Sequence, residues 1–214
     1  MTAAATRGAT SRPGADPAAA SRREIAAWQI GGGLVVFLVG SFLHFLYELS
    51  GFHPLGAVLG SVNESTWEHL KLFFWPGLVM GAIEHAYLRE RVANIWPAVA
   101  ARLWLTAATV AVAFYAYVGV VLPIDGKGTL AGTIATALVG VVVGQVAAYR
   151  LMRAPLRSRA GTRISIAAIL ALLAAFVVFT FAPPRIFLFE DFLGYRYAGQ
   201  YGILDDYTKY LVFR

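Results

Sequence analysis

Residues 164–182, ISIAAILALLAAFVVFTFA, decide the fold class of this chain because they contain no charged residue. A helix needs about 20 mostly apolar residues to cross the hydrocarbon core of a bilayer, and this stretch is close to that length. Four further stretches of similar character precede it. The predicted spans cover about residues 25–47, 67–88, 97–122, 129–149 and 164–182. The sequence therefore predicts an all-α integral membrane bundle of about five transmembrane helices.

The composition of the whole chain supports a membrane protein. Of its 214 residues, 58% are hydrophobic and 14% are charged. Ordinary soluble domains have roughly 45–50% and about 25%, and disordered chains have the opposite balance. The chain contains no cysteine, which excludes a disulfide framework, a cysteine-ligated zinc or iron–sulfur site and a thiolate nucleophile.

Two polar segments flank the spans. Residues 1–23 are rich in Ala, Arg, Ser, Gly and Pro and lack hydrophobic periodicity, so we expect a disordered cytoplasmic tail. Residues 24–182 form the predicted five-helix transmembrane domain. Residues 183–214 begin with two prolines, which stop the last helix, and continue with aromatic residues and mixed charges. They are expected at the outer membrane surface or folded back over the helices.

The basic residues predict the orientation. Most of them lie in the N-terminal tail or beside the connections between spans two and three and between spans four and five. They are Arg7, Arg12, Arg22, Arg23, Arg89, Arg91, Arg102, Arg150, Arg153, Arg157, Arg159 and Arg163. The positive-inside rule places this side in the cytoplasm, with the N-terminus inside and the C-terminus outside. This topology explains the net charge of +6 without nucleic acid, and the Ala- and Arg-rich composition points to a bacterial inner membrane.

A stripe of small residues follows the fourth span at intervals of four, which places it on one helix face. It consists of Gly132, Thr136, Gly140 and Gly144. Small residues let helices approach closely in lipid. The stripe therefore predicts a helix–helix contact, either within the chain or in a homo-oligomer.

Ionisable side chains gather at the outer ends of the first two spans, where they need a functional or structural explanation. His44 and Glu48 are one helical turn apart. A second group, Asn63-Glu64-Ser65-x-Trp67-Glu68-His69-x-Lys71, precedes and opens the second span. The candidate polar site comprises His44, Glu48, Asn63, Glu64, Glu68, His69 and Lys71.

His and carboxylate ligands without cysteine fit Zn²⁺, Mn²⁺ or Fe²⁺. A catalytic metal needs about three protein ligands and an open position. The candidate ligands are His44, Glu48, Glu64, Glu68 and His69. On one continuous helix Glu64 and His69 would lie about 140° apart, so they are not predicted to pair directly. Without a metal, the same groups could serve as acid and base or carry protons.

The same residues also admit a structural interpretation. Ser61-x-x-Glu64 and Ser65-x-x-Glu68 match the capping-box pattern. Glu64, Glu68 and Lys71 fall on one helix face, so Lys71 could neutralise the two carboxylates. Under this interpretation these residues cap the helix and form ion pairs, and they bind no ligand.

A second polar pair, Glu84 and His85, lies near the inner end of the second span. It is about 24 Å from His69 along a helix, too far to join the outer site. We expect a structural role, with Glu84 reaching the inner interface. A transporter would use polar groups at both depths.

Four motifs stand out along the chain: His44-x-x-Tyr47-Glu48, Val62-Asn63-Glu64-Ser65-x-Trp67-Glu68-His69-x-Lys71, Phe181-x-Pro183-Pro184 and Tyr201-Gly202-Ile203. Together they resemble a family of bacterial multi-pass membrane proteins defined as a domain of unknown function, DUF6512. The resemblance covers about residues 24–203 and leaves out the Arg/Ala-rich tail and the residues after Ile203. It implies a bacterial inner-membrane protein and no particular activity.

Three functions compete at this point. A membrane-embedded enzyme, with or without a metal, requires the outer His and Glu side chains to converge on a pocket. A small proton- or ion-coupled transporter requires a polar path from that cluster to Glu84 and His85. A structural or accessory protein requires each carboxylate to be satisfied by a backbone N–H, Lys71 or an Arg.

Overall fold

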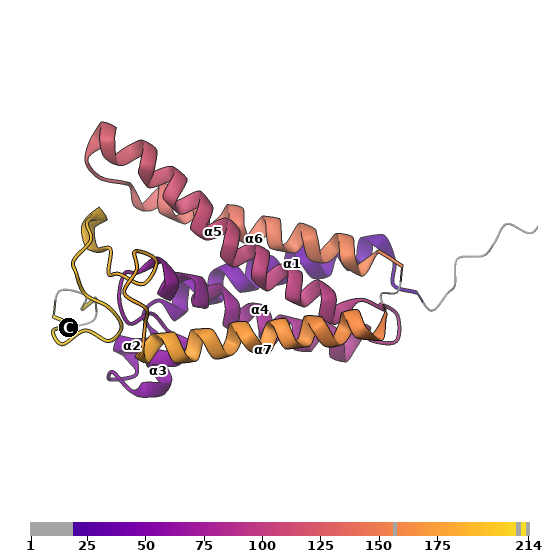
Figure 1. Cartoon of the computed structure of the whole chain (residues 1–214). Coiled ribbons are helices and arrows are strands. Elements are labelled where there is room, and N and C mark those ends of the chain that lie inside the picture. Colours follow the sequence, from indigo (N-terminus) through magenta and orange to yellow (C-terminus); the bar gives the residue numbers. More distant parts are fainter. Residues whose placement is uncertain (1–18, 156–157, 209–210, 213–214) are drawn as a thin grey trace, which may run out of the picture.

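The computed structural model describes residues 19–155, 158–208 and 211–212, and the regular structure in these ranges is helical (Figure 1). The long helices are α1 (Arg22–Leu43), α4 (Thr66–Leu88), α5 (Ile95–Asp125), α6 (Leu130–Met152) and α7 (Arg159–Phe181). Two short helices, α2 (Leu46–Leu49) and α3 (Pro54–Leu59), connect α1 to α4, and the 3₁₀ turn η1 (Leu193–Tyr195) follows α7. The all-helical class is confirmed for the described residues.

Four of the helices, α1, α5, α6 and α7, are long and apolar enough to cross a membrane. They present apolar side chains outward, as helices in lipid do: Leu38 is 66% exposed, Val112 71% and Leu170 58%. Helix α4 has the same 23-residue length as α7 but carries Glu68, Lys71 and Glu84. Of the expected N-terminal tail, residues 1–18 lie outside the described residues, and Arg22 already belongs to α1.

The first predicted span, residues 25–47, is wrong at its outer end because α1 stops at Leu43 and the chain turns before α2. The loop after α3 packs into this break. A side-chain carbon on Gly60 would lie 2.8 Å from the Leu43 carbonyl oxygen and 3.0 Å from the Tyr47 nitrogen. Glycine therefore lets the loop approach the broken helix, and His44 stands at the break.

Helices α5 and α6 form a long hairpin whose tip projects away from the bundle (Figure 1). The small-residue stripe of α6 lies against α5. A side-chain carbon on Gly144 would lie 2.8 Å from the Arg102 carbonyl oxygen, and one on Gly140 would lie 3.0 Å from the Thr106 carbonyl oxygen. The stripe thus makes a helix–helix contact within the chain.

A buried polar layer joins α1, α4 and α5. Arg102 donates from Nη1 to Glu84 at 2.9 Å and from Nη2 to the Gly77 carbonyl oxygen at 3.0 Å. Gln29 donates to the same carboxylate at 2.9 Å. Arg102 is 2% exposed, so counting it with the cytoplasmic loop charges was wrong. Glu84 is fully buried and does not reach the interface, because Arg102 pairs with it inside the bundle.

The segment after α7 folds back over the outer ends of α1 and α4, at the opposite end of the bundle from the start of α1 (Figure 1). It is held to the loop before α4 and to the first turn of α4 by hydrogen bonds, among them one from the Tyr207 hydroxyl to the Ser61 carbonyl oxygen at 3.3 Å. The Trp67 N–H donates to the Leu188 carbonyl at 2.9 Å, and the Asn63 amide donates to the Gly202 carbonyl at 2.8 Å. The Glu64 N–H donates to the buried Asp191 carboxylate at 2.9 Å.

Candidate functional site

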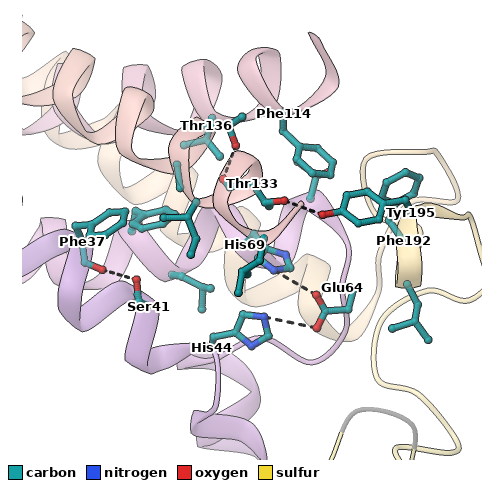
Figure 2. Close-up of a pocket in the computed structure, with 18 of the residues that line it drawn as sticks. Phe37, Ser41, His44, Glu64, His69, Phe114, Thr133, Thr136, Phe192 and Tyr195 are labelled. Carbon is teal, nitrogen blue, oxygen red and sulfur yellow. Dashed lines mark hydrogen bonds and ion pairs between the residues drawn. The ribbon is translucent and has the colours of Figure 1, made fainter. Parts of the chain in front are cut away.

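Three polar side chains from separate segments meet where α1 ends and α4 begins: His44 after α1, Glu64 before α4, and His69 in the first turn of α4 (Figure 2). Nε2 of His44 lies 3.5 Å from Oε1 of Glu64, and Nε2 of His69 lies 3.5 Å from Oε2 of the same carboxylate. One ligand atom from each residue falls within 4.8 Å of the other two, and all three side chains are partly buried. We call these residues the His–Glu–His site.

The position of Glu64 depends on where α4 begins. Ser65 is the N-cap, and its hydroxyl accepts a hydrogen bond from the Glu68 N–H at 3.3 Å. Glu64 therefore precedes the helix, and the Asp191 contact to its N–H holds its backbone in place. The angle of about 140° expected on one continuous helix does not apply. For this reason the prediction that Glu64 and His69 do not pair was wrong.

The ring of His69 has a defined orientation. Its Nδ1 lies 2.8 Å from the Ser65 carbonyl oxygen, which can only accept a hydrogen bond, so Nδ1 carries the proton. In the neutral ring Nε2 is then an unprotonated acceptor, and it faces the Glu64 carboxylate. Histidines that bind metals have this arrangement, with one ring N–H donated to a backbone carbonyl and the other nitrogen free.

The charges at the site are interdependent. Burial favours the neutral forms of both His44 and Glu64, but their hydrogen bond and mutual attraction outweigh it. The pKa of His44 is raised above its usual 6.5, and the pKa of Glu64 falls from 4.5 to about 2 with help from the charge of His69. Glu64 is thus an ionised carboxylate at neutral pH.

A cavity of about 470 Å³ adjoins the His–Glu–His site and lies among α1, α4, α5, α6 and η1 (Figure 2). Apart from the site, its walls are mainly apolar and aromatic, with threonines on α6 and at the start of α4. Its volume is in the range of small-molecule sites, about 300–1,000 Å³. The three site residues form the polar end of a mainly apolar pocket.

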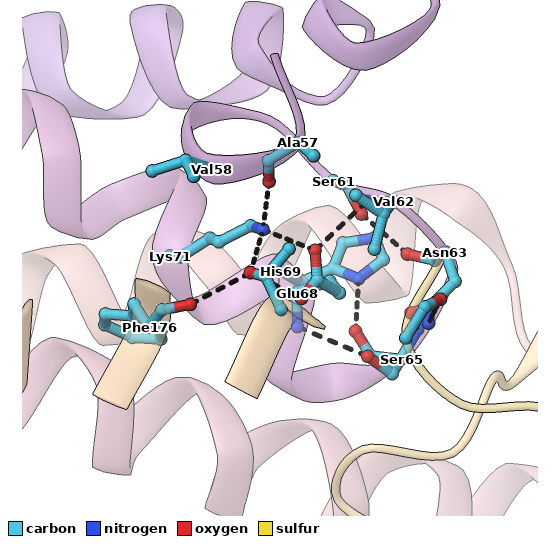
Figure 3. Close-up of polar contacts among 12 residues, drawn as sticks. Ala57, Val58, Ser61, Val62, Asn63, Ser65, Glu68, His69, Lys71 and Phe176 are labelled. Atoms are coloured by element: carbon cyan, nitrogen blue, oxygen red, sulfur yellow. Dashed lines mark hydrogen bonds and ion pairs between the residues drawn. The ribbon is translucent and has the colours of Figure 1, made fainter. Parts of the chain in front are cut away.

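Glu68 and Lys71, also predicted for the site, are turned away from the cavity into a sealed ion pair (Figure 3). The Lys71 ammonium lies 2.6 Å from Glu68, and it donates to the Ala57 carbonyl at 2.6 Å and to the Thr180 hydroxyl at 2.8 Å. Glu68 also accepts from the Val62 N–H at 3.0 Å. Both side chains are at most 2% exposed. This pair ties α3, α4 and α7 together.

The remaining candidates have other partners. Glu48, in α2, accepts from the Val212 N–H at 2.9 Å. The break between α1 and α2 separates it from His44, so the two residues do not share one helix as predicted. Asn63 anchors the C-terminal segment through Gly202. His85 does not share the surroundings of Glu84: its ring packs near Trp96, with centroids 5.1 Å apart.

Several participants were not expected from the sequence. Thr180 completes the Glu68–Lys71 pair, Gln29 and Arg102 hold Glu84, and Tyr195 reaches the cavity wall. Arg102 offered a signal, since a single Arg inside a long apolar run needs a partner. Thr180 offered little, because one threonine in a span is ordinary.

Comparison with known proteins gives one match. A family model described as a family of unknown function (DUF6512) matches residues 19–203. No curated protein and no solved structure matches the chain.

Proposed function

The chain belongs to the DUF6512 family of unknown function, and we propose from its own residues that it is a membrane-embedded enzyme with a divalent-metal site. The proposed ligands are His44, Glu64 and His69, and the cavity beside them is the proposed substrate pocket. Glu48 and Glu68 leave the ligand set that we expected from the sequence, because each is held elsewhere.

The proposed topology has five spans, namely the four apolar helices and α4. Of these five, α4 is the least exposed to lipid. The start of α1 and the C-terminal segment lie at opposite ends of the bundle, as an odd number of crossings requires (Figure 1). The basic connections before α5 and before α7 share the end at which α1 starts. With these inside, residues 183–214 and the His–Glu–His site face the outside of a bacterial inner membrane.

One observation carries the metal proposal: Nε2 of His69 lies 3.5 Å from an oxygen of the Glu64 carboxylate, while Nδ1 of the same ring faces the Ser65 carbonyl oxygen at 2.8 Å. When the ring is neutral, Nε2 and the carboxylate oxygen are both acceptors. Two acceptors at this distance repel unless a cation lies between them. With metal–ligand bonds of 2.0–2.2 Å, a tetrahedral zinc site separates its ligand atoms by about 3.3–3.5 Å. The two nitrogen–oxygen distances are 3.5 Å to different oxygens of Glu64, and one ligand atom from each residue lies within 4.8 Å of the other two, so the three side chains would have to close slightly around an ion. A proton on His69 is the metal-free alternative.

Two histidines and one carboxylate without cysteine suit Zn²⁺ best, with Mn²⁺ and Fe²⁺ as alternatives. Three protein ligands leave a position open, as in catalytic rather than structural zinc sites. When bound there, such an ion lowers the pKa of a coordinated water and polarises a carbonyl or phosphoryl oxygen. The open position would face the cavity, which supports hydrolysis of a substrate held in it.

The cavity supports an enzyme over a transporter. Phe37 and Phe73 stack with centroids 6.4 Å apart on its inner side, where Leu72 and Val110 also line it. Neither Glu84 nor His85 is among the lining residues. The cavity therefore does not extend to the second polar pair. A purely structural role fits Glu68 and Glu84, each paired with a buried cation, but leaves the cavity at Glu64 unexplained.

The test is the metal content of detergent-purified protein, measured by elemental mass spectrometry after incubation with Zn²⁺, Mn²⁺ or Fe²⁺. We expect close to one equivalent of metal in the wild type and loss of most of it in Glu64→Gln and His69→Ala. Glu48→Gln is the matched control, because this carboxylate lies at the same end of the bundle but outside the site. Equal metal in Glu64→Gln and Glu48→Gln, or none in the folded wild type, would overturn the metal site.

A further inference from the structure

The cavity beside the His–Glu–His site is covered on one side and open on another. We infer that it binds an uncharged amphiphile, with an ester, amide or hydroxyl oxygen in its head group, which enters from the lipid phase. The contact between that oxygen and a metal rests on the proposed function. The apolar chain site and its lateral access rest on the cavity alone.

The C-terminal segment covers the cavity at the outer end of the bundle. Phe192 and Tyr195 line it there, and the Tyr195 hydroxyl lies 3.0 Å from the Thr133 hydroxyl of α6 (Figure 2). Phe192 also packs edge-to-face on Phe114 of α5, with centroids 5.8 Å apart. Tyr195 adopts a φ of 65°, a left-handed conformation that a non-glycine residue rarely takes. The packed and hydrogen-bonded ring holds this conformation, so the cover is a built part of the site.

The open side lies between the outer halves of α1 and α6. The inner halves of these helices touch, since a side-chain carbon on Gly33 would lie 3.1 Å from Gln145. Further out, both helices line the cavity, and two of the lining residues on α6 are exposed: Leu130 is 76% exposed and Ile134 46%. In the proposed topology these side chains face acyl chains. A molecule dissolved in the bilayer can thus reach the cavity without crossing the cover.

The walls select the chemistry of the occupant. Phe37, Phe73 and Ala137 offer an apolar surface for a chain or ring. The described cavity lining contains no Lys or Arg, and its two histidines already face the Glu64 carboxylate, so a phosphate head group would find no basic side chain free to neutralise it. The polar lining consists of the His–Glu–His site and a few hydroxyls. An uncharged head group with one or two oxygens matches this surface, and a phospholipid head group does not.

The experiment uses the full chain in phosphatidylcholine vesicles and a long-chain alcohol that carries a photoreactive diazirine. After illumination, mass spectrometry locates the labelled residues. We expect labels on the cavity-facing residues of α1 and α6, and at least a tenfold loss of these labels in Ala137→Trp, which fills the cavity. Leu138→Trp is the matched control, because Leu138 is the next residue, 46% exposed and outside the lining. Equal cavity labelling in the two variants would overturn the inference.

Competition in the wild-type protein tests the head group and does not depend on any variant folding. Excess unlabelled dodecanol should remove the cavity labels, and dodecyl phosphate should remove them at least tenfold less effectively. Equal or better competition by the phosphate would contradict the uncharged head group.

Labelling of chelator-treated protein separates this inference from the metal proposal. If the protein binds no metal but its cavity is labelled, the metal site is refuted and the lipid-accessible pocket is supported. A metal-loaded protein without cavity labels would refute the pocket alone.

Discussion

Glu64 and Glu68 stand four positions apart in one motif, yet their surroundings differ in almost every respect. Glu68 is 2% exposed and is enclosed by Lys71, the Val62 N–H and Thr180. Glu64 is 31% exposed, its partners are two histidines, and it borders a cavity. One carboxylate is buried against the Lys71 ammonium, and the other is partly exposed beside two imidazole rings and the cavity.

This difference separates structural from functional polar groups at one end of a membrane bundle. A buried charge whose hydrogen bonds are complete has nothing left to offer a ligand. A half-buried carboxylate beside two imidazoles can still bind a cation. Replacing members of the two groups should therefore affect different properties, stability in the first and ligand binding in the second.

The largest effect is expected for Lys71→Met, which leaves the Glu68 charge buried without its cation. The free energy of unfolding should fall by about 3–5 kcal/mol. The measurement is unfolding of the purified protein in detergent. Adding Glu68→Gln to this variant should recover part of the loss, because the unpaired charge is then removed. A loss below about 1 kcal/mol in Lys71→Met would show that the sealed pair is not structural.

A smaller loss is expected for Thr180→Val, which keeps the shape of the side chain and removes its hydroxyl. Thr180 accepts from Lys71 at 2.8 Å, so the variant leaves one ammonium N–H unpaired. The expected cost is about 1–3 kcal/mol in the same unfolding assay. Ser165, whose partly buried hydroxyl donates only to the Gly161 carbonyl oxygen of its own helix, supplies the control Ser165→Ala, with a smaller loss. Equal losses in the two variants would argue against the network.

Glu64→Gln should leave stability within about 1 kcal/mol of the wild type, because partly exposed ion pairs contribute little. Metal binding should nevertheless be weakened at least about 100-fold, since a neutral amide is a poor ligand for Zn²⁺. Isothermal titration of the chelator-treated protein with Zn²⁺ measures this. A large stability loss with unchanged metal affinity would assign Glu64 the role of Glu68 and end the distinction between them.

The smallest effect is a dependence on pH in chelator-treated protein. The folded pKa of His44 is raised above 6.5, so its contribution is complete below pH 6.5 and is lost as pH rises through the raised value. The folded pKa of Glu64 is about 2, so its contribution is complete above pH 4.5 and is lost as pH falls.

The melting temperatures of the wild type and Glu64→Gln should therefore differ most between about pH 4.5 and 6.5, by no more than about 2–4 °C. Glu48→Gln, measured in parallel, corrects for general effects of removing a carboxylate. A difference that stays constant from pH 4 to about 9 would contradict the charged His44–Glu64 pair.

The hydrophobic pattern was sufficient to predict the helices, because apolar length alone specifies them in lipid. It could not predict the break at His44, which depends on Gly60 packing from a later loop. The candidate residues were also visible in the sequence, but their partners were not. In the sequence nothing distinguishes Glu68 from Glu64. The difference comes from contacts with Thr180, Ala57 and Asp191, which lie in other segments of the chain.

The start of α4 had the largest influence on the site. Ser61-x-x-Glu64 and Ser65-x-x-Glu68 both match a capping box, and the sequence does not choose between them. In the structure Ser65 is the cap, whereas the Ser61 hydroxyl donates to the Asn63 carbonyl. A start four residues earlier would have placed Glu64 on the helix, away from His69.

X-ray absorption at the zinc edge of the zinc-loaded protein tests the central claim most directly. The account predicts two histidine nitrogens and one or two oxygens at about 2.0–2.2 Å in the wild type and in Glu48→Gln. It predicts loss of the histidine signal in His44→Ala and His69→Ala. A spectrum with oxygen ligands only, or one that these two variants leave unchanged, would contradict a metal site at His44, Glu64 and His69.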